Sequence, residues 1–300
     1  MSTAHTERGN PFDLDDNDAY QRWREARLAA APRDIEELIV EVRDPRRLTD
    51  AEQSALLACC QRANMAIYAG ATGDDPSREI PVAIGARLGL RRLDHNPGAE
   101  EDAVTALTVQ TDALHQGYIP YSNRPLSWHT DGYYNAPARQ VHGLLMHCVR
   151  PAREGGRNAL LDHEIAYILI RDEDPAHIRA LMQPACLTIP ADPGSETAGR
   201  AARPVSTGPV FSVDRHGELH MRYTDRGRNI VWADDPATRA AVACLKRLLS
   251  RETPWHLSAR LGSGWGLVCN NVLHTRTGFT DGPEPRLIYR ARYYDRVGRA

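Results

Sequence analysis

The chain has no apolar run that approaches the roughly 20 residues needed to cross a bilayer. Its first 20 residues are polar and acidic, and they lack the charged start and apolar stretch of a secretory signal. Basic residues (37) and acidic residues (39) nearly balance, without a basic block that would track phosphates. We therefore expect neither a membrane partner nor a nucleic-acid partner.

The six cysteines form no CxxC pair, and five of them have apolar neighbours in the sequence. This usage favours a reducing, cytoplasmic location. There is no internal repeat and no Gly/Ser linker in the 300 residues, of which 42% are apolar and 25% charged. We expect a mobile tail over residues 1–15 and a single domain over 16–300, helical to about 100 and rich in strands over about 104–294.

Five helix starts are predicted from capping patterns. Asp16 precedes a helix through Leu28, and Thr49 begins a capping box with Glu52. The second helix is expected to place four apolar residues on one stripe, namely Leu56, Cys60, Ala63 and Ile67. An aspartate followed by proline predicts three further starts, at Asp75, Asp174 and Asp235.

Short β-rich runs bounded by turn residues dominate after residue 100. They cover 106–111, 143–149, 158–162, 209–213, 218–223, 265–270 and 287–294, with an earlier run at 38–43. These runs do not alternate with helices, which disfavours a doubly wound parallel sheet. We expect a mainly β fold with flanking helices, either an antiparallel sandwich or a barrel.

A histidine and an aspartate lie two residues apart in SWHTDGYY (127–134). In an extended strand such residues share a face, so His129 and Asp131 offer a nitrogen and an oxygen ligand side by side. Gly132 permits a sharp turn immediately afterwards. This pair alone is weak evidence for a metal site, because it also fits two surface residues.

A second element, CNNVLHTR (269–276), supplies His274 after an apolar run. Two histidines and one carboxylate form the facial triad that binds iron(II) and leaves coordination positions open. Zinc accepts the same ligands. The remaining candidates in apolar surroundings, His142, His147 and His163, are interpreted as hydrogen-bonded structural residues.

The third element is PRLIYRARYY (285–294), in which Arg286, Arg290 and Arg292 share strand parity with Ile288. Arginines that face a cavity are well shaped to hold carboxylates through two parallel hydrogen bonds. The same pattern also fits an apolar face on the core with arginines in solvent. The pattern alone does not decide between these two orientations.

Together these elements resemble the taurine and chlorophenoxyacetate dioxygenase family, which includes the clavaminate synthase-like enzymes. The shared features are W-H-x-D, a strand ending in N-x-x-x-H, an R-x-x-x-R strand and the double glycine of EGGRNALLD (154–162). The resemblance covers roughly residues 104–294. It implies a double-stranded β-helix, that is, a cupin-like jelly roll with helices outside.

The resemblance also implies a non-haem iron dioxygenase in which His129, Asp131 and His274 bind Fe(II). 2-Oxoglutarate would be the cosubstrate and O2 the oxidant, with succinate and CO2 as products. Arg286 would hold the distal carboxylate of 2-oxoglutarate, and Arg290 would lie nearer the primary substrate. Where the family usually has threonine after the double glycine, this chain has Asn158, whose amide still donates hydrogen bonds.

Polar residues near the ligands are candidates for binding the primary substrate: Tyr118, Tyr121, Asn123 and Tyr134. Packing explains the tyrosines equally well. Arg290 favours a small anionic or zwitterionic substrate such as an amino acid, carboxylate or sulfonate, most simply hydroxylated. The segment RYTDRGRN (222–229) is interpreted as a solvated loop, with a lid that contacts substrate as the alternative.

Two other functions remain open at this point. One is a zinc-dependent hydrolase at the same triad, although the sequence has no HExxH helix to supply a base. The other is a jelly-roll protein that binds a ligand without turnover. Besides the small-molecule substrate, a homo-oligomer stays open as a partner.

Overall fold

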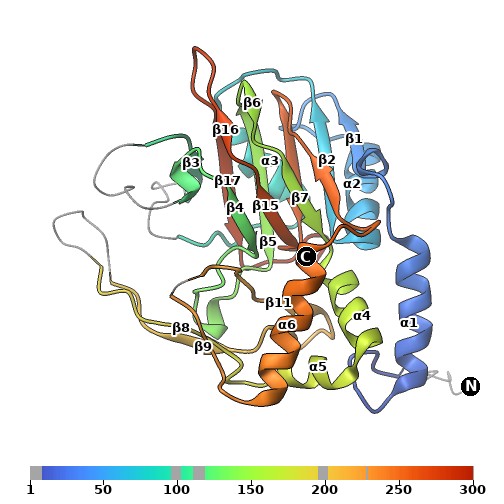
Figure 1. Ribbon diagram of the computed structural model, residues 1–300. Helices are drawn as coiled ribbons and strands as arrows, with labels where there is room; N and C mark the ends of the chain where they lie inside the picture. Colours follow the sequence, from blue (N-terminus) through green and yellow to red (C-terminus); the bar gives the residue numbers. More distant parts are fainter. Residues whose placement is uncertain (1–8, 96–102, 111–118, 195–201, 228, 300) are drawn as a thin grey trace, which may run out of the picture.

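The computed structural model describes residues 9–95, 103–110, 119–194, 202–227 and 229–299. Two sheets face each other, and helices pack outside them (Figure 1). This arrangement is the jelly roll with flanking helices that the resemblance implies. None of the helices in the described part of the chain combines the length and apolar character needed to span a membrane.

The large sheet contains six strands in the order β1-β2-β14-β5-β17-β3. Only β1 and β2 run parallel; the other neighbours are antiparallel. The strands are β1 (Ile39–Val42), β2 (Met65–Gly70), β14 (Trp265–Cys269), β5 (Gly143–Arg150), β17 (Leu287–Tyr293) and β3 (Thr105–Leu107).

The small sheet is antiparallel, in the order β13-β7-β15-β4. Its strands are β13 (Leu257–Ala259), β7 (Asn158–Leu161), β15 (Leu273–Arg276) and β4 (Leu126–His129). Shorter ladders complete the fold: β12 (Val231–Trp232) with β8 (Leu187–Ile189) and β9 (Ser206–Gly208), β10 (Phe211–Val213) with β11 (Leu219–Met221), and β16 (Phe279–Thr280) with β6 (Glu154–Gly155).

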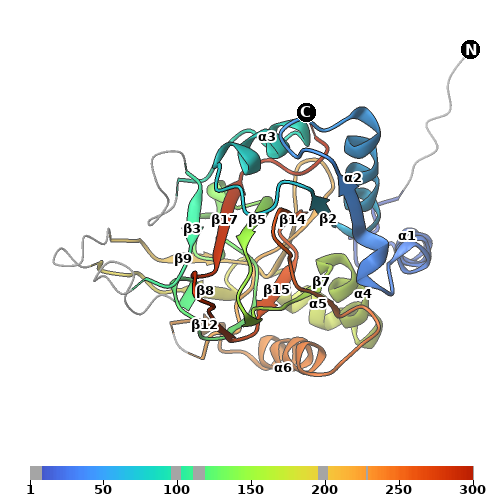
Figure 2. The same cartoon turned by 90° about the horizontal axis from the view of Figure 1, so that it is seen from above.

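Successive side chains along the strands of the large sheet point to opposite faces, and the apolar side chains on each face form a separate core. In β5, Leu144 and Met146 contribute to the cluster between the two sheets, whereas Leu145 and Val149 contribute to the cluster on the outer face. The outer cluster is completed by apolar residues of helix α2 (Asp50–Ala63) and helix α3 (Glu79–Arg87). Seen from above, α2 and α3 lie on one side of the large sheet, and β7 and β15 lie on the other (Figure 2).

The helices follow their predicted caps at four of five starts. Side chains of Asp16, Thr49, Asp174 and Asp235 accept backbone N–H groups at the starts of α1, α2, α5 and α6, and Thr49 forms the capping box with Glu52. The helices are α1 (Asn17–Ala30), α2 (Asp50–Ala63), α3 (Glu79–Arg87), α4 (His163–Glu173), α5 (Pro175–Leu181) and α6 (Pro236–Ser250), with 3-10 turns η1 (Ile35–Leu38), η2 (Ile119–Tyr121) and η3 (Pro137–Arg139).

Two predicted details are wrong, and one helix was not predicted. The helix expected from Asp75 begins only at Glu79, because the Asp75 carboxylate accepts from the Ser77 backbone and pairs with Arg46. Ile67 does not continue the stripe of α2; the left-handed Asn64 ends that helix, and Ile67 lies in β2. Helix α4 was not predicted, since most of its residues are buried, including the polar residues His163, Glu164 and Arg171.

The expected mobile tail is also shorter than predicted. Residues 1–8 lie outside the described part of the chain, but residues 9–15 are packed against the fold. The Phe12 ring lies edge-on to Trp23 and Tyr167, with centroids 5.0 and 5.5 Å away. Arg171 donates to the carbonyls of Pro11 and Asp13. The tail prediction is therefore wrong for these residues, because it counted apolar residues and overlooked one well-placed aromatic ring.

Candidate metal centre

Two histidines face each other across neighbouring strands of the small sheet. His129 ends β4 and pairs directly with His274 of β15, and their ring centroids are 4.2 Å apart. Each Nδ1 lies 2.9 Å from a backbone carbonyl, Ser127 for His129 and Val272 for His274. Because a carbonyl only accepts, Nδ1 carries the proton in both rings and Nε2 is left with a lone pair.

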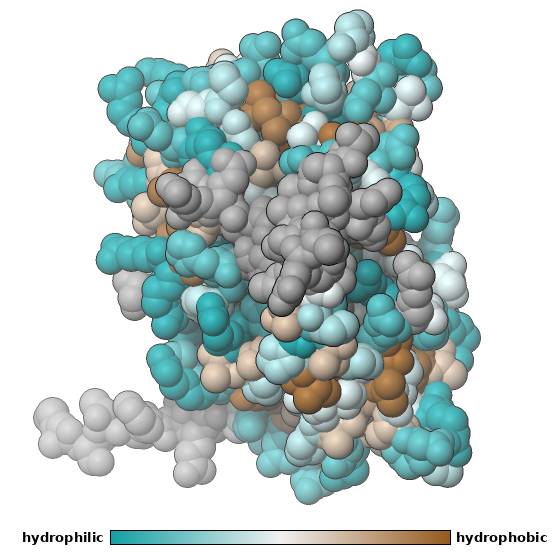
Figure 3. Space-filling view, turned by 90° about the vertical axis from the view of Figure 1, so that its left-hand side faces the viewer, coloured by the Kyte–Doolittle hydropathy of each residue, from teal (hydrophilic) through white to brown (hydrophobic). Residues whose placement is uncertain are grey.

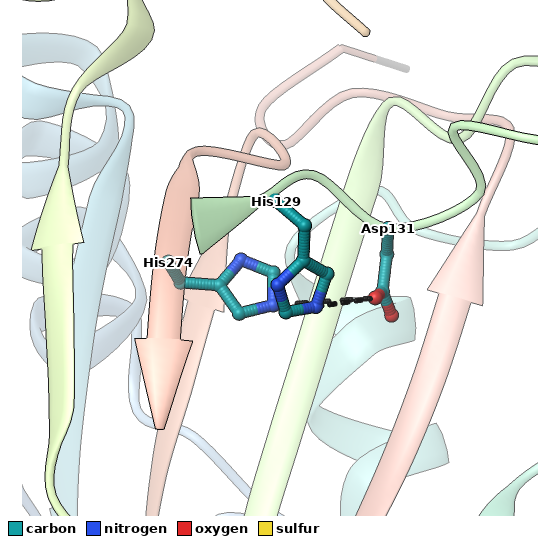
Figure 4. Close-up of side chains that lie close together, drawn as sticks. All are labelled: His129, Asp131 and His274. Carbon is teal, nitrogen blue, oxygen red and sulfur yellow. Dashed lines mark ion pairs between the residues drawn. The ribbon is translucent and has the colours of Figure 1, made fainter. Parts of the chain in front are cut away.

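Asp131 completes a group of three potential ligands. Its Oδ1 lies 3.6 Å from His129 Nε2 and 4.0 Å from His274 Nε2 (Figure 4). The three ligand atoms all lie within 4.8 Å of one another, and all three residues are buried. The structure thus brings together the three residues that the sequence proposed as ligands.

The position of Asp131 depends on a turn and not on strand parity alone. Strand β4 ends at His129, and Asp131 already belongs to the following turn. Gly132 has φ +67° there, and a Cβ at this position would lie 2.4 Å from Val141 Cγ2. The tight turn that Gly132 was expected to permit is therefore present, and only glycine fits it.

The charges of the triad suit a cation. Burial by itself raises the pKa of the Asp131 carboxyl, but Arg290 and then His129 lower it well below its usual range. Burial, with His129 beside it, lowers the pKa of His274 to about 4. At neutral pH the group therefore offers an anionic oxygen and a neutral nitrogen. Asp131 Oδ2 is buried without a hydrogen-bond partner in the described part of the chain.

The arginines of β17 face inward. Ile288 belongs to the cluster between the two sheets, whereas Tyr289 and Ala291 belong to the outer cluster. Arg290 shares the parity of Ile288, and its Nη1 lies 3.3 Å from Asp131 Oδ2. The structure decides the orientation that the sequence left open. Arg286 and Arg292 are buried and Arg290 is only slightly exposed, so none of these side chains points into solvent.

Arg286 and Asn158 lie together beside the triad strands. Both line a small cavity, together with Gly156 of the double glycine. Within the described residues the Arg286 guanidinium forms no ion pair; it lies 5.1 Å from the centre of the Phe279 ring. Burial lowers the pKa of Arg286 to about 10. Asn158 uses one amide hydrogen on the Thr275 carbonyl, at 2.8 Å.

The residues expected to bind substrate fall in different surroundings. Tyr118 lies outside the described residues. Tyr121 is buried in the cluster between the sheets, whereas Asn123 is exposed. The Tyr134 hydroxyl accepts a hydrogen bond from Arg292 Nη1 at 2.8 Å. Their binding roles stay predictions.

Two features of the site were missed by sequence reasoning. Asn271 hydrogen-bonds the backbone of Asp131 from the turn before β15. The sequence signal that could have found Asn271 is a polar residue in the turn between two apolar strands. In the structure its φ is 52°, a left-handed conformation that asparagine tolerates. The second feature is the buried pair of Arg292 with Asp94. Asp94 comes from the first hundred residues, where no diagnostic motif was found.

Two of the three histidines interpreted as hydrogen-bonded structural residues have such a partner. His147 Nδ1 lies 2.9 Å from the Tyr68 hydroxyl, and His163 Nε2 lies 3.1 Å from the Leu219 carbonyl. The ring of the third, His142, lies 4.6 Å from the ring of His220, and within the described residues its side chain makes no hydrogen bond. A second group of possible ligands in the described residues, Glu173, His177 and Cys244, lies on the helical side. Its glutamate is already paired with Arg247.

Comparisons with known proteins agree with this geometry. The sequence profile of the family described as "Taurine catabolism dioxygenase TauD, TfdA family" matches residues 29–292. A uridine-5'-phosphate dioxygenase from Amycolatopsis sp is 31% identical over 165 residues, which is 53% of this chain and 57% of that relative. The chain thus matches less than two thirds of this relative's length.

Another uridine-5'-phosphate dioxygenase, from Streptomyces sp, is 30% identical over 201 residues, or 64% of this chain and 69% of the relative. Among solved structures, the non-heme iron oxygenase OrfP in complex with Fe, succinate and (3S)-hydroxy-L-Arg aligns with a TM-score of 0.61. Its sequence identity is 16%, and the alignment covers 83% of this chain and 82% of OrfP. This likeness confirms the predicted fold.

Proposed function

Because the chain belongs to the TauD/TfdA family of dioxygenases, as its sequence motifs predicted, we propose that it oxidises a small anionic substrate with Fe(II), 2-oxoglutarate and O2. The observation that carries the proposal is the buried group of His129, Asp131 and His274. Two imidazole nitrogens and one carboxylate on neighbouring strand ends fit iron(II), with positions left for cosubstrate and O2.

The residues present also fit a bound dicarboxylate. Arg286 is a buried guanidinium that forms no ion pair within the described residues, and a carboxylate would supply the missing counter-charge. Asn158 lies at the same cavity with an amide group to contribute. We propose that these two residues bind 2-oxoglutarate, with Arg286 carrying most of the affinity.

When bound, the iron and 2-oxoglutarate would provide the chemistry that oxidises a C–H bond of the substrate, with succinate and CO2 as coproducts. This chain's residues supply position and charge. Hydrogen bonds from Nδ1 to Ser127 and Val272 fix both imidazole rings, and Asn271 fixes the main chain of Asp131. Arg290, beside the ligand carboxylate, is the group proposed to orient an anionic substrate.

For the substrate we propose a nucleoside 5'-phosphate, with uridine 5'-phosphate as the first candidate. Support comes from the two relatives near 30% identity that carry this substrate in their names. The inward orientation of Arg290 adds support, because it places a guanidinium beside the triad. Hydroxylation is the default outcome.

The proposal on iron and cosubstrate is tested by anaerobic addition of Fe(II) and 2-oxoglutarate. We expect the weak visible charge-transfer band of a chelated keto acid in the wild type and its loss in His274→Ala. Absence of the band in the wild type would overturn the reaction class. A band that survives unchanged in the variant would overturn the ligand assignment.

The substrate proposal needs a separate measurement of O2-dependent succinate formation. Uridine 5'-phosphate should stimulate succinate release well above the rate without substrate, whereas uridine, arginine and taurine should stimulate it less. If another acid proves the better stimulant, the nucleotide proposal is wrong and the dioxygenase proposal remains.

Two further proposals concern the chain as a whole. We propose that residues 16–300 act as one domain, since the family match spans 29–292 and the strands of both sheets come from both halves of the chain. We also propose a reducing, cytoplasmic location, which the six free cysteines support.

A further inference from the structure

The segment that follows β11 pairs with the strand that carries the first metal-ligand candidate. Tyr223 and Thr130 are joined by a backbone hydrogen bond of 2.9 Å, and the Asp225 N–H donates to the Trp128 carbonyl at 2.8 Å. Thr224 lies directly opposite His129 in an antiparallel bridge. This stretch was interpreted from sequence as a solvated loop, but its first half forms an edge of the site.

This pairing decides which side chains of the segment face the triad. Residues opposite each other in an antiparallel pair share a face, and neighbours along the strand alternate. Asp225 faces α6 with Trp128: Asp225 pairs with Lys246 at 3.6 Å, and the Trp128 indole donates to the Leu249 carbonyl. Arg226, one residue further, therefore shares the face of His129.

Arg226 reaches the turn that carries Asp131. Its Nη1 donates to the Tyr133 hydroxyl at 2.7 Å, and the Tyr133 ring lies edge-on to the Tyr134 ring at 5.2 Å. A second guanidinium, that of Arg203, lies 5.6 Å from the centre of the Tyr134 ring. The two tyrosines that follow Asp131 are thus flanked by two half-buried cations.

Neither cation is neutralised by a carboxylate in the described part of the chain. As far as the described residues go, Arg203 donates to the carbonyls of Pro204 and Pro190, and Arg226 to the Tyr133 hydroxyl. Asp192 pairs with Arg203 through backbone hydrogen bonds, while its carboxylate accepts from the Gly194 N–H.

The other nearby acids already have partners. Asp94 is paired with Arg292, Asp225 with Lys246 and Asp131 with Arg290. Among the described residues, the rim of the site beside Tyr133 and Tyr134 therefore carries an excess of positive charge. On the side of the molecule that carries β8 and β9, Figure 3 shows mainly hydrophilic residues around the grey atoms, with small hydrophobic patches. A polar ligand suits this face better than an apolar one.

We propose that Arg203 and Arg226, together with the hydroxyls of Tyr133 and Tyr134, form a subsite for the phosphate group of the substrate. This inference rests on the proposed function and names the part of the molecule that recognises the phosphoryl end. A phosphomonoester carries nearly two negative charges near neutral pH. Arg290 alone, already shared with Asp131, leaves such a group only partly neutralised.

The experiment compares binding of uridine 5'-phosphate and of uridine to the enzyme loaded with Fe(II) and 2-oxoglutarate under anaerobic conditions. Isothermal titration calorimetry gives both dissociation constants without turnover. For Arg226→Gln and Arg203→Gln we expect the nucleotide to bind about tenfold to a hundredfold more weakly than to wild type. Uridine affinity should stay unchanged in both.

The matched control is Arg139→Gln. Arg139 also lies 5.6 Å from a tyrosine ring, that of Tyr294, and donates to its hydroxyl, but it is exposed and its partner ring does not follow Asp131 in the turn. This variant should bind the nucleotide like wild type. Arg226→Lys, which keeps the charge, should recover part of the affinity that Arg226→Gln loses.

Two results would overturn the subsite. The first is that both glutamine variants bind the nucleotide as tightly as the wild type does. The second is that the wild-type enzyme does not prefer uridine 5'-phosphate to uridine, either because it binds both equally or because it binds neither. The keto-acid band depends on Arg286 and the triad, so it reports on the reaction class independently. A normal band with an unaffected Arg226→Gln would leave the proposed function intact and remove only the subsite.

Discussion

Asn271 holds the main chain of Asp131 from two directions. Its side-chain Oδ1 accepts the Asp131 N–H at 2.8 Å, and its Nδ2 donates to the Asp131 carbonyl at 2.9 Å. The same amide also donates to the Val141 carbonyl at 2.7 Å. Because Asn271 lies three residues before His274, it ties the turn of one ligand candidate to the strand of another.

We predict that Asn271→Ala lowers both the stability and the metal affinity of the protein. The substitution leaves three buried backbone groups without partners, and it places alanine at a φ of 52°. The free energy of unfolding should fall by about 3 kcal/mol, as measured by urea denaturation of the metal-free protein. Fe(II) or Mn(II) should bind at least about tenfold more weakly in calorimetric titration.

The neighbouring residue provides the control for this prediction. Asn270 is also buried, but it bonds to Asn64 and to the Val297 N–H, away from the ligand turn. Asn270→Ala should therefore lower stability while metal affinity stays near that of wild type. Equal losses of metal affinity in the two variants would show that Asn271 acts only through general stability.

A second prediction concerns Arg286. Arg286→Ala should weaken 2-oxoglutarate binding about tenfold to a hundredfold, because a buried carboxylate would lose its charged partner. Titration of the keto-acid band gives the dissociation constant. Arg150→Ala serves as a control, since Arg150 makes an exposed ion pair with Glu284 at 3.2 Å. Unchanged 2-oxoglutarate affinity in Arg286→Ala would refute its assigned role.

The local features of this fold were predictable because they depend on residues close in sequence. A cap such as Thr49 with Glu52 closes hydrogen bonds across three residues, and the structure contains it as expected. His129, Asp131 and His274 were found for a similar reason: a short spacing and a place at the end of an apolar run. Helix α4 escaped prediction because its polar residues are themselves buried.

The orientation of the arginines on β17 could not be predicted in this way. Which face of β17 lies between the sheets depends on where the small sheet packs, and its strands come from four separate parts of the chain. The same holds for Arg226, whose direction follows from the pairing of Thr224 with His129 across 95 residues of sequence. Such placements are set by tertiary contacts, and no local pattern records them.

A third prediction tests the buried pair of Arg292 and Asp94. Both side chains are almost fully buried, and Asp94 also accepts the Tyr294 hydroxyl at 2.6 Å. Removing one partner leaves the other charge uncompensated, so Asp94→Leu should cost about 3–5 kcal/mol in the free energy of unfolding.

The double variant Arg292→Met, Asp94→Leu should cost clearly less than the sum of the two single substitutions, because neither charge remains buried without its partner. Chemical denaturation of the four proteins gives the coupling free energy between the two positions. Strict additivity would mean that Arg292 is stabilised mainly by its bond to Tyr134 and not by Asp94.

The last prediction is a pH dependence of the free energy of unfolding that arises from the buried His147. Burial lowers the pKa of His147 to about 4, from the ordinary 6.5 expected in the unfolded chain. Between these two values the unfolded state binds a proton that the folded state does not, so stability is complete above about pH 6.5 and falls as the pH drops toward 4.

His147→Gln keeps an acceptor for the Tyr68 hydroxyl but does not titrate. Its loss of stability between pH 7 and pH 5, measured by urea denaturation, should be smaller than that of wild type by about 1–2 kcal/mol. An identical pH dependence in the two proteins would show that His147 does not contribute this proton.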